Sequence, residues 1–77
     1  MILKLPVQDS LTGRIFTSIR KFYNDMKDIL DVDVIIVKGG KILWEGSIKE
    51  KKIYEYLMEY EIKSIYNTDN GLGLLIE

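Results

Sequence analysis

The strongest constraint on the fold is a pair of adjacent glycines, Gly39 and Gly40, between two strand-like runs. Residues 32–37 are largely β-branched and almost wholly apolar, and residues 41–45 resume as a second strand-like run. A tight hairpin turn requires positive φ at its central residues, which glycine adopts without steric penalty. The sequence therefore predicts a β-hairpin over residues 32–45.

Three further strands are predicted outside this hairpin. Residues 2–7 alternate with the period of a half-buried strand, and Pro6 marks its end. Residues 61–66 alternate again, and residues 72–76 form a last apolar run. The intervening residues 69–71, Asp-Asn-Gly, are typical of a turn, so a second hairpin is predicted at the end of the sequence.

Two helices are predicted between the strands. Asp9 or Ser10 can cap the first, and apolar residues spaced three and four apart then extend for about five turns: Leu11, Ile15, Ile19, Phe22, Met26 and Leu30, with Ile29 beside them. Ser47 and Glu50 have the spacing of a capping box, which predicts the start of the second helix. Its expected inner face comprises Ile53, Tyr54, Leu57, Met58 and Tyr60.

These elements predict a single α+β domain over residues 1–77, with the order βαββαββ. Right-handed crossovers place both helices on one face of an antiparallel sheet, which gives a ferredoxin-like core with an added C-terminal strand. A chain of 77 residues has room for one domain only.

The chain contains no histidine and no cysteine. It therefore lacks the commonest proton-transfer and transition-metal side chain and the thiolate nucleophile, and we expect no enzymatic activity, metal or cofactor. The longest unbroken apolar stretch, residues 34–37, is far shorter than the roughly 20 residues of a membrane helix, and no signal-peptide pattern opens the sequence. We expect a cytoplasmic protein, and the abundance of Lys, Glu, Ile and Tyr suits a thermophilic source.

The best candidate ligand site lies between the first strand and the first helix. Free amides, two hydroxyls and a guanidinium there can gather round an anion or a small carboxylate; the residues are Asp9, Ser10, Thr12, Gly13 and Arg14. The alternative is a capped helix with a glycine in its first turn. The segment resembles the amino-acid-sensing ACT domains, in which an acidic residue and a glycine at this turn help to form an effector pocket. The resemblance implies that Asp9 and Gly13 take these two positions.

The apolar strands favour an interface. Residues 34 and 36 lie on one side of the central hairpin and residues 35 and 37 on the other, yet two helices can cover only one sheet face. An open apolar face usually marks association, so we expect a homodimer formed by a sheet face or an edge strand, unless the sheet curls to cover itself. The candidate interface residues are Ile35, Val37, Trp44, Tyr56 and Leu75.

Three other patterns suggest weaker candidates. The basic tip at residues 38–41, with Trp44 behind it, resembles a phosphate- and base-binding surface, but the acidic pI of about 5.4 argues against nucleic acid. The aspartates at 25, 28, 31 and 33 and the turn at 67–71 lack the spacing of a Ca²⁺ loop. The sequence thus predicts a protein-interaction or oligomerisation module, which associates with itself or serves as a small subunit of a protein complex. Effector binding at residues 9–14 is the alternative.

Overall fold

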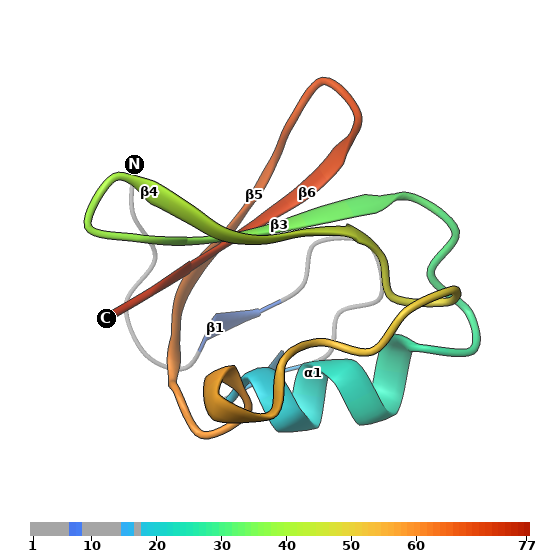
Figure 1. Cartoon of the computed structure of the whole chain (residues 1–77), viewed down its shortest axis with the longest axis horizontal. Helices are drawn as coiled ribbons and strands as arrows, with labels where there is room; N and C mark the ends of the chain where they lie inside the picture. Colours follow the sequence, from blue (N-terminus) through green and yellow to red (C-terminus); the bar gives the residue numbers. More distant parts are fainter. Residues whose placement is uncertain (1–6, 9–14, 17) are drawn as a thin grey trace.

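The computed structural model describes residues 7–8, 15–16 and 18–77, and combines a mixed four-stranded sheet with one α-helix (Figure 1). In chain order the elements are β1 (Val7–Gln8), β2 (Ile15–Phe16), α1 (Ile19–Met26), β3 (Asp33–Lys38), β4 (Lys41–Ser47), the 3-10 turn η1 (Glu55–Leu57), β5 (Ile62–Asn67) and β6 (Gly71–Ile76). The helix and η1 lie on the same side of the sheet. No helix among the described residues has the length and apolarity needed to span a bilayer.

Both predicted hairpins are confirmed. Strands β3 and β4 pair antiparallel around Gly39 and Gly40, whose φ angles of 59° and 79° are those the turn requires. Strands β5 and β6 also pair antiparallel, and Thr68 closes their turn by donating its N–H to the carbonyl of Gly71 at 2.8 Å. The local turn residues thus determine both hairpins.

The α+β class is confirmed, but the ferredoxin-like arrangement with two helices is wrong. The sheet order is β4-β3-β6-β5, and β3 and β6 pair in parallel at its centre. The last strand is therefore central rather than an added edge. Its position follows from its composition, because Leu72 and Leu74 on one face and Leu75 on the other leave no polar side for water.

The first helix is shorter than predicted. It begins at Ile19, because Ser18 is extended and its hydroxyl accepts a hydrogen bond from the Lys21 amide at 3.2 Å. Ile15 and Phe16, which were predicted to be helical, instead form β2, in keeping with the strand preference of β-branched and aromatic residues. Ile2–Pro6 and Leu11 of the predicted elements lie outside the described residues, whereas Val7 pairs with Phe16 in β1 and β2.

The second helix is absent, and one 3-10 turn takes its place. Ser47 belongs to β4, and its hydroxyl accepts from the Lys49 amide two residues on, which forms a local turn rather than a helix cap. Ile48 and Ile53 are both buried, although residues five apart on a helix point about 140° away from each other. An extended path through Tyr54 (φ −53°, ψ 136°) lets both reach the core.

The core lies between the sheet and the layer formed by α1 and residues 48–58. Ile19, Phe22 and Met26 of the helix are almost wholly buried, as their spacing predicts. They pack in one cluster with the buried sheet residues Val34, Ile36, Trp44, Ile62, Leu72, Leu74 and Ile76 and with Leu30, Ile48, Ile53, Leu57 and Met58. One face of the sheet is therefore fully covered by α1 and residues 48–58.

Candidate interaction surface

The opposite face of the sheet, called here the outer face, carries a second set of apolar side chains. The pairing register defines it, since residues directly opposite each other on neighbouring strands share a face. Ile35 pairs with Gly73, which pairs in turn with Tyr66. In the next row Val37 lies between Ile42 and Leu75. The apolar members of the outer face are thus Ile35, Val37, Ile42, Tyr66 and Leu75.

These residues are less well covered than their neighbours on the inner face. Ile42 is 55% exposed and Tyr66 is 40% exposed, and Ile35, Val37 and Leu75 are half-buried. The adjacent β3 residues Val34 and Ile36, which point inward, are 0% exposed. The outer face therefore presents apolar surface that no described element packs against.

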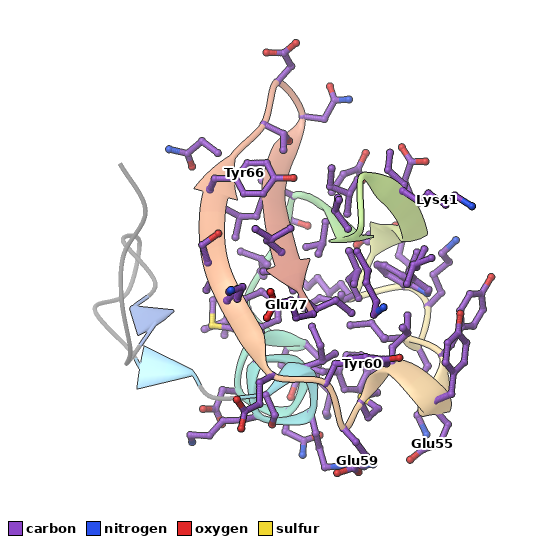
Figure 2. All side chains as sticks on the ribbon, turned by 90° about the vertical axis from the view of Figure 1, so that its left-hand side faces the viewer. Lys41, Glu55, Glu59, Tyr60, Tyr66 and Glu77 are labelled. Atoms are coloured by element: carbon purple, nitrogen blue, oxygen red, sulfur yellow. The ribbon has the colours of Figure 1, made fainter. Side chains whose placement is uncertain are left out.

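Gly73 leaves room for the Tyr66 ring to lie over the sheet. A side chain at Gly73 would collide with the Tyr66 ring, which occupies the space where the Cβ of residue 73 would stand. The ring reaches from β5 toward β6 (Figure 2). A glycine in a strand commonly permits such close approach, and here it gives the outer face a smooth aromatic border.

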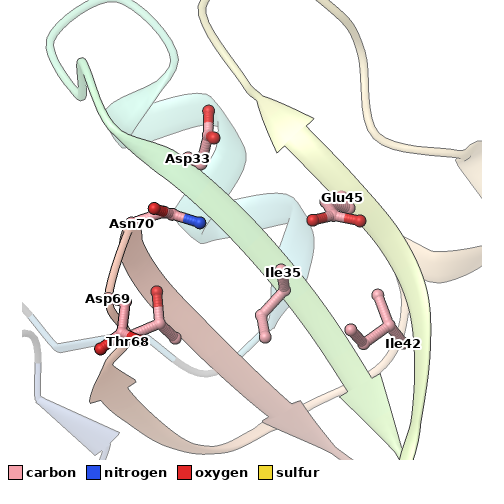
Figure 3. Close-up of a pocket in the computed structure, with 7 residues that line it drawn as sticks. All are labelled: Asp33, Ile35, Ile42, Glu45, Thr68, Asp69 and Asn70. Carbon is pink, nitrogen blue, oxygen red and sulfur yellow. The ribbon is translucent and has the colours of Figure 1, made fainter.

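One end of the outer face is a shallow acidic hollow of about 240 Å³ (Figure 3). Ile35 and Ile42 form its apolar part, and the carboxylates of Asp33, Glu45 and Asp69 surround it. These three carboxylates, called here the acidic end, form no ion pair with any described residue. Each is exposed to solvent. Among the described residues no group of acidic side chains has the arrangement of a metal site.

The other end of the same hairpin is basic. Lys38 and Lys41 flank the glycine turn and are called here the basic tip. Lys41 projects into solvent (Figure 2), and the Lys38 ammonium lies 5.9 Å from the centre of the Tyr60 ring. Neither lysine has an acidic partner among the described residues, whereas nearby Lys63 is neutralised by Glu77 at 2.9 Å. Lys38 pairs with Lys41 and with the buried Ile76, so the basic tip belongs to the inner face, and the outer face carries only the acidic end.

The most strongly connected polar group lies elsewhere and has a structural role. Arg20 on α1 contacts the carboxylates of Glu55 at 2.7 Å and Glu59 at 2.6 Å. The hydrogen bond from Arg20 lowers the pKa of Glu55, and the charge of Arg20 adds to the effect. The Ile19 and Arg20 amides donate to the Tyr60 and Met58 carbonyls at 3.0 Å. These contacts fasten the start of α1 to residues 55–60.

The structure brings three of the predicted interface residues together and separates two. Ile35, Val37 and Leu75 lie side by side on the outer face. Trp44 is only 4% exposed and belongs to the core, with the Lys51 ammonium 5.3 Å from its ring centre, so it is covered against base stacking. Tyr56 is exposed on η1 and stacks on Tyr54, on the side of the molecule that carries α1.

Two further sets of sequence candidates are the predicted ligand residues and the aspartates of residues 25–33, of which Asp33 belongs to the acidic end. The predicted ligand residues Asp9, Ser10, Thr12, Gly13 and Arg14 lie outside the described residues. Asp25 pairs with Lys21 at 3.0 Å, and Asp31 lies 3.8 Å from Lys49, as expected of a solvated surface.

Sequence reasoning missed Ile42 and Tyr66. Ile42 pairs with Val37 while Trp44 pairs with Ile36, so Leu43 is the extra residue of a β-bulge. The bulge breaks the alternation and places Ile42 outward although Trp44 is inward. Tyr66 and Gly73 each lie two residues from the turn, which places them opposite each other in a hairpin. This placement was the sequence signal that could have predicted the Tyr66 ring lying over Gly73.

The comparisons with known proteins give no relative for this chain. No protein-family model matches it, and no curated protein or solved structure shows significant similarity to it.

Proposed function

We propose that this protein is an association module that packs the outer face of its sheet against a second copy of the chain. The observation that carries the proposal is the exposure of Ile42, 55%, on the edge strand β4 of the outer face, directly beside the apolar Val37. A contiguous apolar patch on a small soluble domain usually marks a binding surface. The half-buried Ile35, Val37 and Leu75 extend this patch across three strands.

A face contact is favoured over pairing of edge strands. The edge strands β4 and β5 each carry a bulge, at Leu43 and Lys63 respectively. Bulges and charged side chains are common protections against edge-to-edge pairing, and β4 also carries the exposed Lys41 and Glu45. The outer face has no such protection at its centre.

The size of the surface sets the expected strength. Four strands about 4.8 Å apart and six residues long give a face of about 300 Å² in projection. Two copies together bury well under the roughly 1,200 Å² of a standard stable interface. The expected association is therefore weak and depends on protein concentration.

The proposal is tested by Ile42→Lys, with Ile29→Lys as the matched control. Both isoleucines are surface residues of nearly equal exposure, 55% and 57%, but Ile29 follows α1 and lies away from the outer face. Molar mass is measured by light scattering over a range of concentrations, with circular dichroism to verify folding. Ile42→Lys should abolish the increase in mass that wild type and Ile29→Lys show. A wild-type protein that stays monomeric at every concentration refutes the proposal.

A further inference from the structure

The acidic end of the outer face has no counter-charge in the part of the chain that the structure describes. Asp33, Glu45 and Asp69 are all exposed and form no ion pair there, whereas Asp25 on α1 is paired with Lys21 at 3.0 Å. Opposite charges across an interface favour the right partner, and like charges exclude the wrong one. The acidic end therefore favours a partner that brings positive charge.

The strands of a second copy do not bring that charge to the outer face. The lysines of the four strands of the sheet are Lys38, Lys41 and Lys63. The first two belong to the inner face, and Lys63 is paired with Glu77 at 2.9 Å. When two outer faces meet, apolar surface is buried, but the acidic end receives no free cation from the partner's strands.

The hollow at the acidic end combines an apolar floor with a charged rim (Figure 3). Ile35 and Ile42 line the floor, and the three carboxylates surround it. Lysine and arginine side chains are divided in the same way, since they pack an aliphatic stem on apolar surface and keep the charged head in water. A carboxylate that accepts a hydrogen bond from such a head forms a contact about twice as strong as a neutral one. The hollow therefore matches a lysine or arginine side chain.

We propose that the outer face binds an extended basic segment of another protein. The segment places a lysine or arginine in the hollow and an aliphatic side chain on Val37 and Leu75. On β3, Val37 lies two residues beyond Ile35 of the hollow, a distance of about 7 Å. Side chains two residues apart on an extended segment share a face and have the same spacing. The partner's pattern is therefore a basic and an aliphatic residue separated by one residue.

This segment competes with the second copy, because both cover the outer face. Self-association through that face is weak by the proposed function, so the face is free in dilute protein and open to the segment. The inference goes beyond the proposed function in the identity of the partner, and it rests on the proposed function only for the competition. Saturation with the segment should convert self-associated protein into complexes of one chain.

The test uses three fluorescently labelled peptides, whose binding to dilute protein is measured by anisotropy at low salt. The first is Ser-Lys-Ser-Ile-Ser-Lys-Ser, the second has glutamate for both lysines, and the third has serine for isoleucine. The second and third should bind at least about fivefold more weakly. Glu45→Gln and Asp33→Asn should each weaken binding of the first about two- to fivefold. The control Glu50→Gln removes an exposed carboxylate from the layer on the inner side of the sheet and should leave binding unchanged.

The proposal is overturned if the first peptide does not bind, or if either of the other two binds as tightly. It is also overturned if the two acidic-end variants weaken binding no more than Glu50→Gln does. Light scattering of concentrated wild type tests the competition, since a molar mass unchanged by saturating first peptide places the peptide elsewhere and overturns the proposal. Wild type that is monomeric at every concentration refutes the proposed function alone, because the anisotropy measurements on dilute protein decide the proposal without it.

Discussion

In the segment between β4 and β5, the side chain of Ile53 should contribute to the free energy of unfolding, whereas that of its neighbour Tyr54 should not. Ile53 is 1% exposed and packs in the core, whereas Tyr54 is 54% exposed. A helix with the inner face predicted from sequence would bury both. The substitutions Ile53→Ala and Tyr54→Ala therefore distinguish the extended path from a helix at two adjacent positions.

The expected difference is large for a domain of this size. Replacing a buried isoleucine by alanine costs about 2–4 kcal/mol, because apolar contacts are lost and a cavity remains. Tyr54→Ala removes an exposed ring and its stacking on Tyr56, 6.0 Å away, and should cost no more than about 1 kcal/mol. A chain of 77 residues has a total stability of about 4–11 kcal/mol. Ile53→Ala should therefore remove a substantial part of it.

Urea denaturation of dilute protein measures both changes, because dilution removes any contribution from self-association. Trp44 is the only tryptophan and is buried in the same core, so its fluorescence reports directly on core unfolding. With a slope of about 1 kcal/mol per molar urea, the midpoint of Ile53→Ala should fall by about 2–4 M. Equal shifts for the two variants, or a cost below about 1 kcal/mol for Ile53→Ala, would refute the extended path.

Two other predictions concern the ion pairs of Arg20 with Glu55 and Glu59 and the contact between Tyr66 and Gly73. Arg20 lowers the pKa of Glu55 in the folded state, so the stability from this pair is present near neutral pH and is lost as pH falls through the ordinary glutamate range and below. Arg20→Met should therefore flatten the acid side of the Tm–pH curve, and parallel curves for the two proteins would contradict this. Gly73→Ala should cost about 1–3 kcal/mol because the added methyl group meets the Tyr66 ring. In a Tyr66→Ala background the same change should be nearly neutral, and thermal unfolding of the four proteins tests that coupling.

Local chemistry made the two hairpins predictable. Gly39 and Gly40 need no distant partner to adopt positive φ, and the turn before Gly71 is likewise determined by adjacent residues. The inner stripe of α1 was also predictable, because Ile19, Phe22 and Met26 keep the helical period. These features depend on residues within a few positions of one another.

The sequence predictions were wrong where the same local pattern fits two structures, or where contacts between distant residues determine the structure. Ser18 and Ser47 both stand before stretches with helical spacing, but only Ser18 caps a helix, since Ile48 and Ile53 must both reach a core built by distant strands. The parallel pairing of β3 with β6 joins segments over thirty residues apart and leaves no turn signal. Its only trace in the sequence is that both strands are apolar on both faces.

The bulge at Leu43 determines both which β4 residue enters the core and which one lies on the outer face. In a regular strand Ile42 and Trp44 would lie on the same face, so both would point into the core or both would point away from it. The extra residue separates them, so that the large Trp44 ring enters the core and the smaller, β-branched Ile42 lies outward opposite Val37. Leu43 itself packs partly against the core. The exposure of Ile42 at the β4 edge of the outer face is therefore a consequence of the strand geometry that places the Trp44 ring inside, and with Ile35, Val37 and Leu75 it forms the apolar patch on which the proposed association rests.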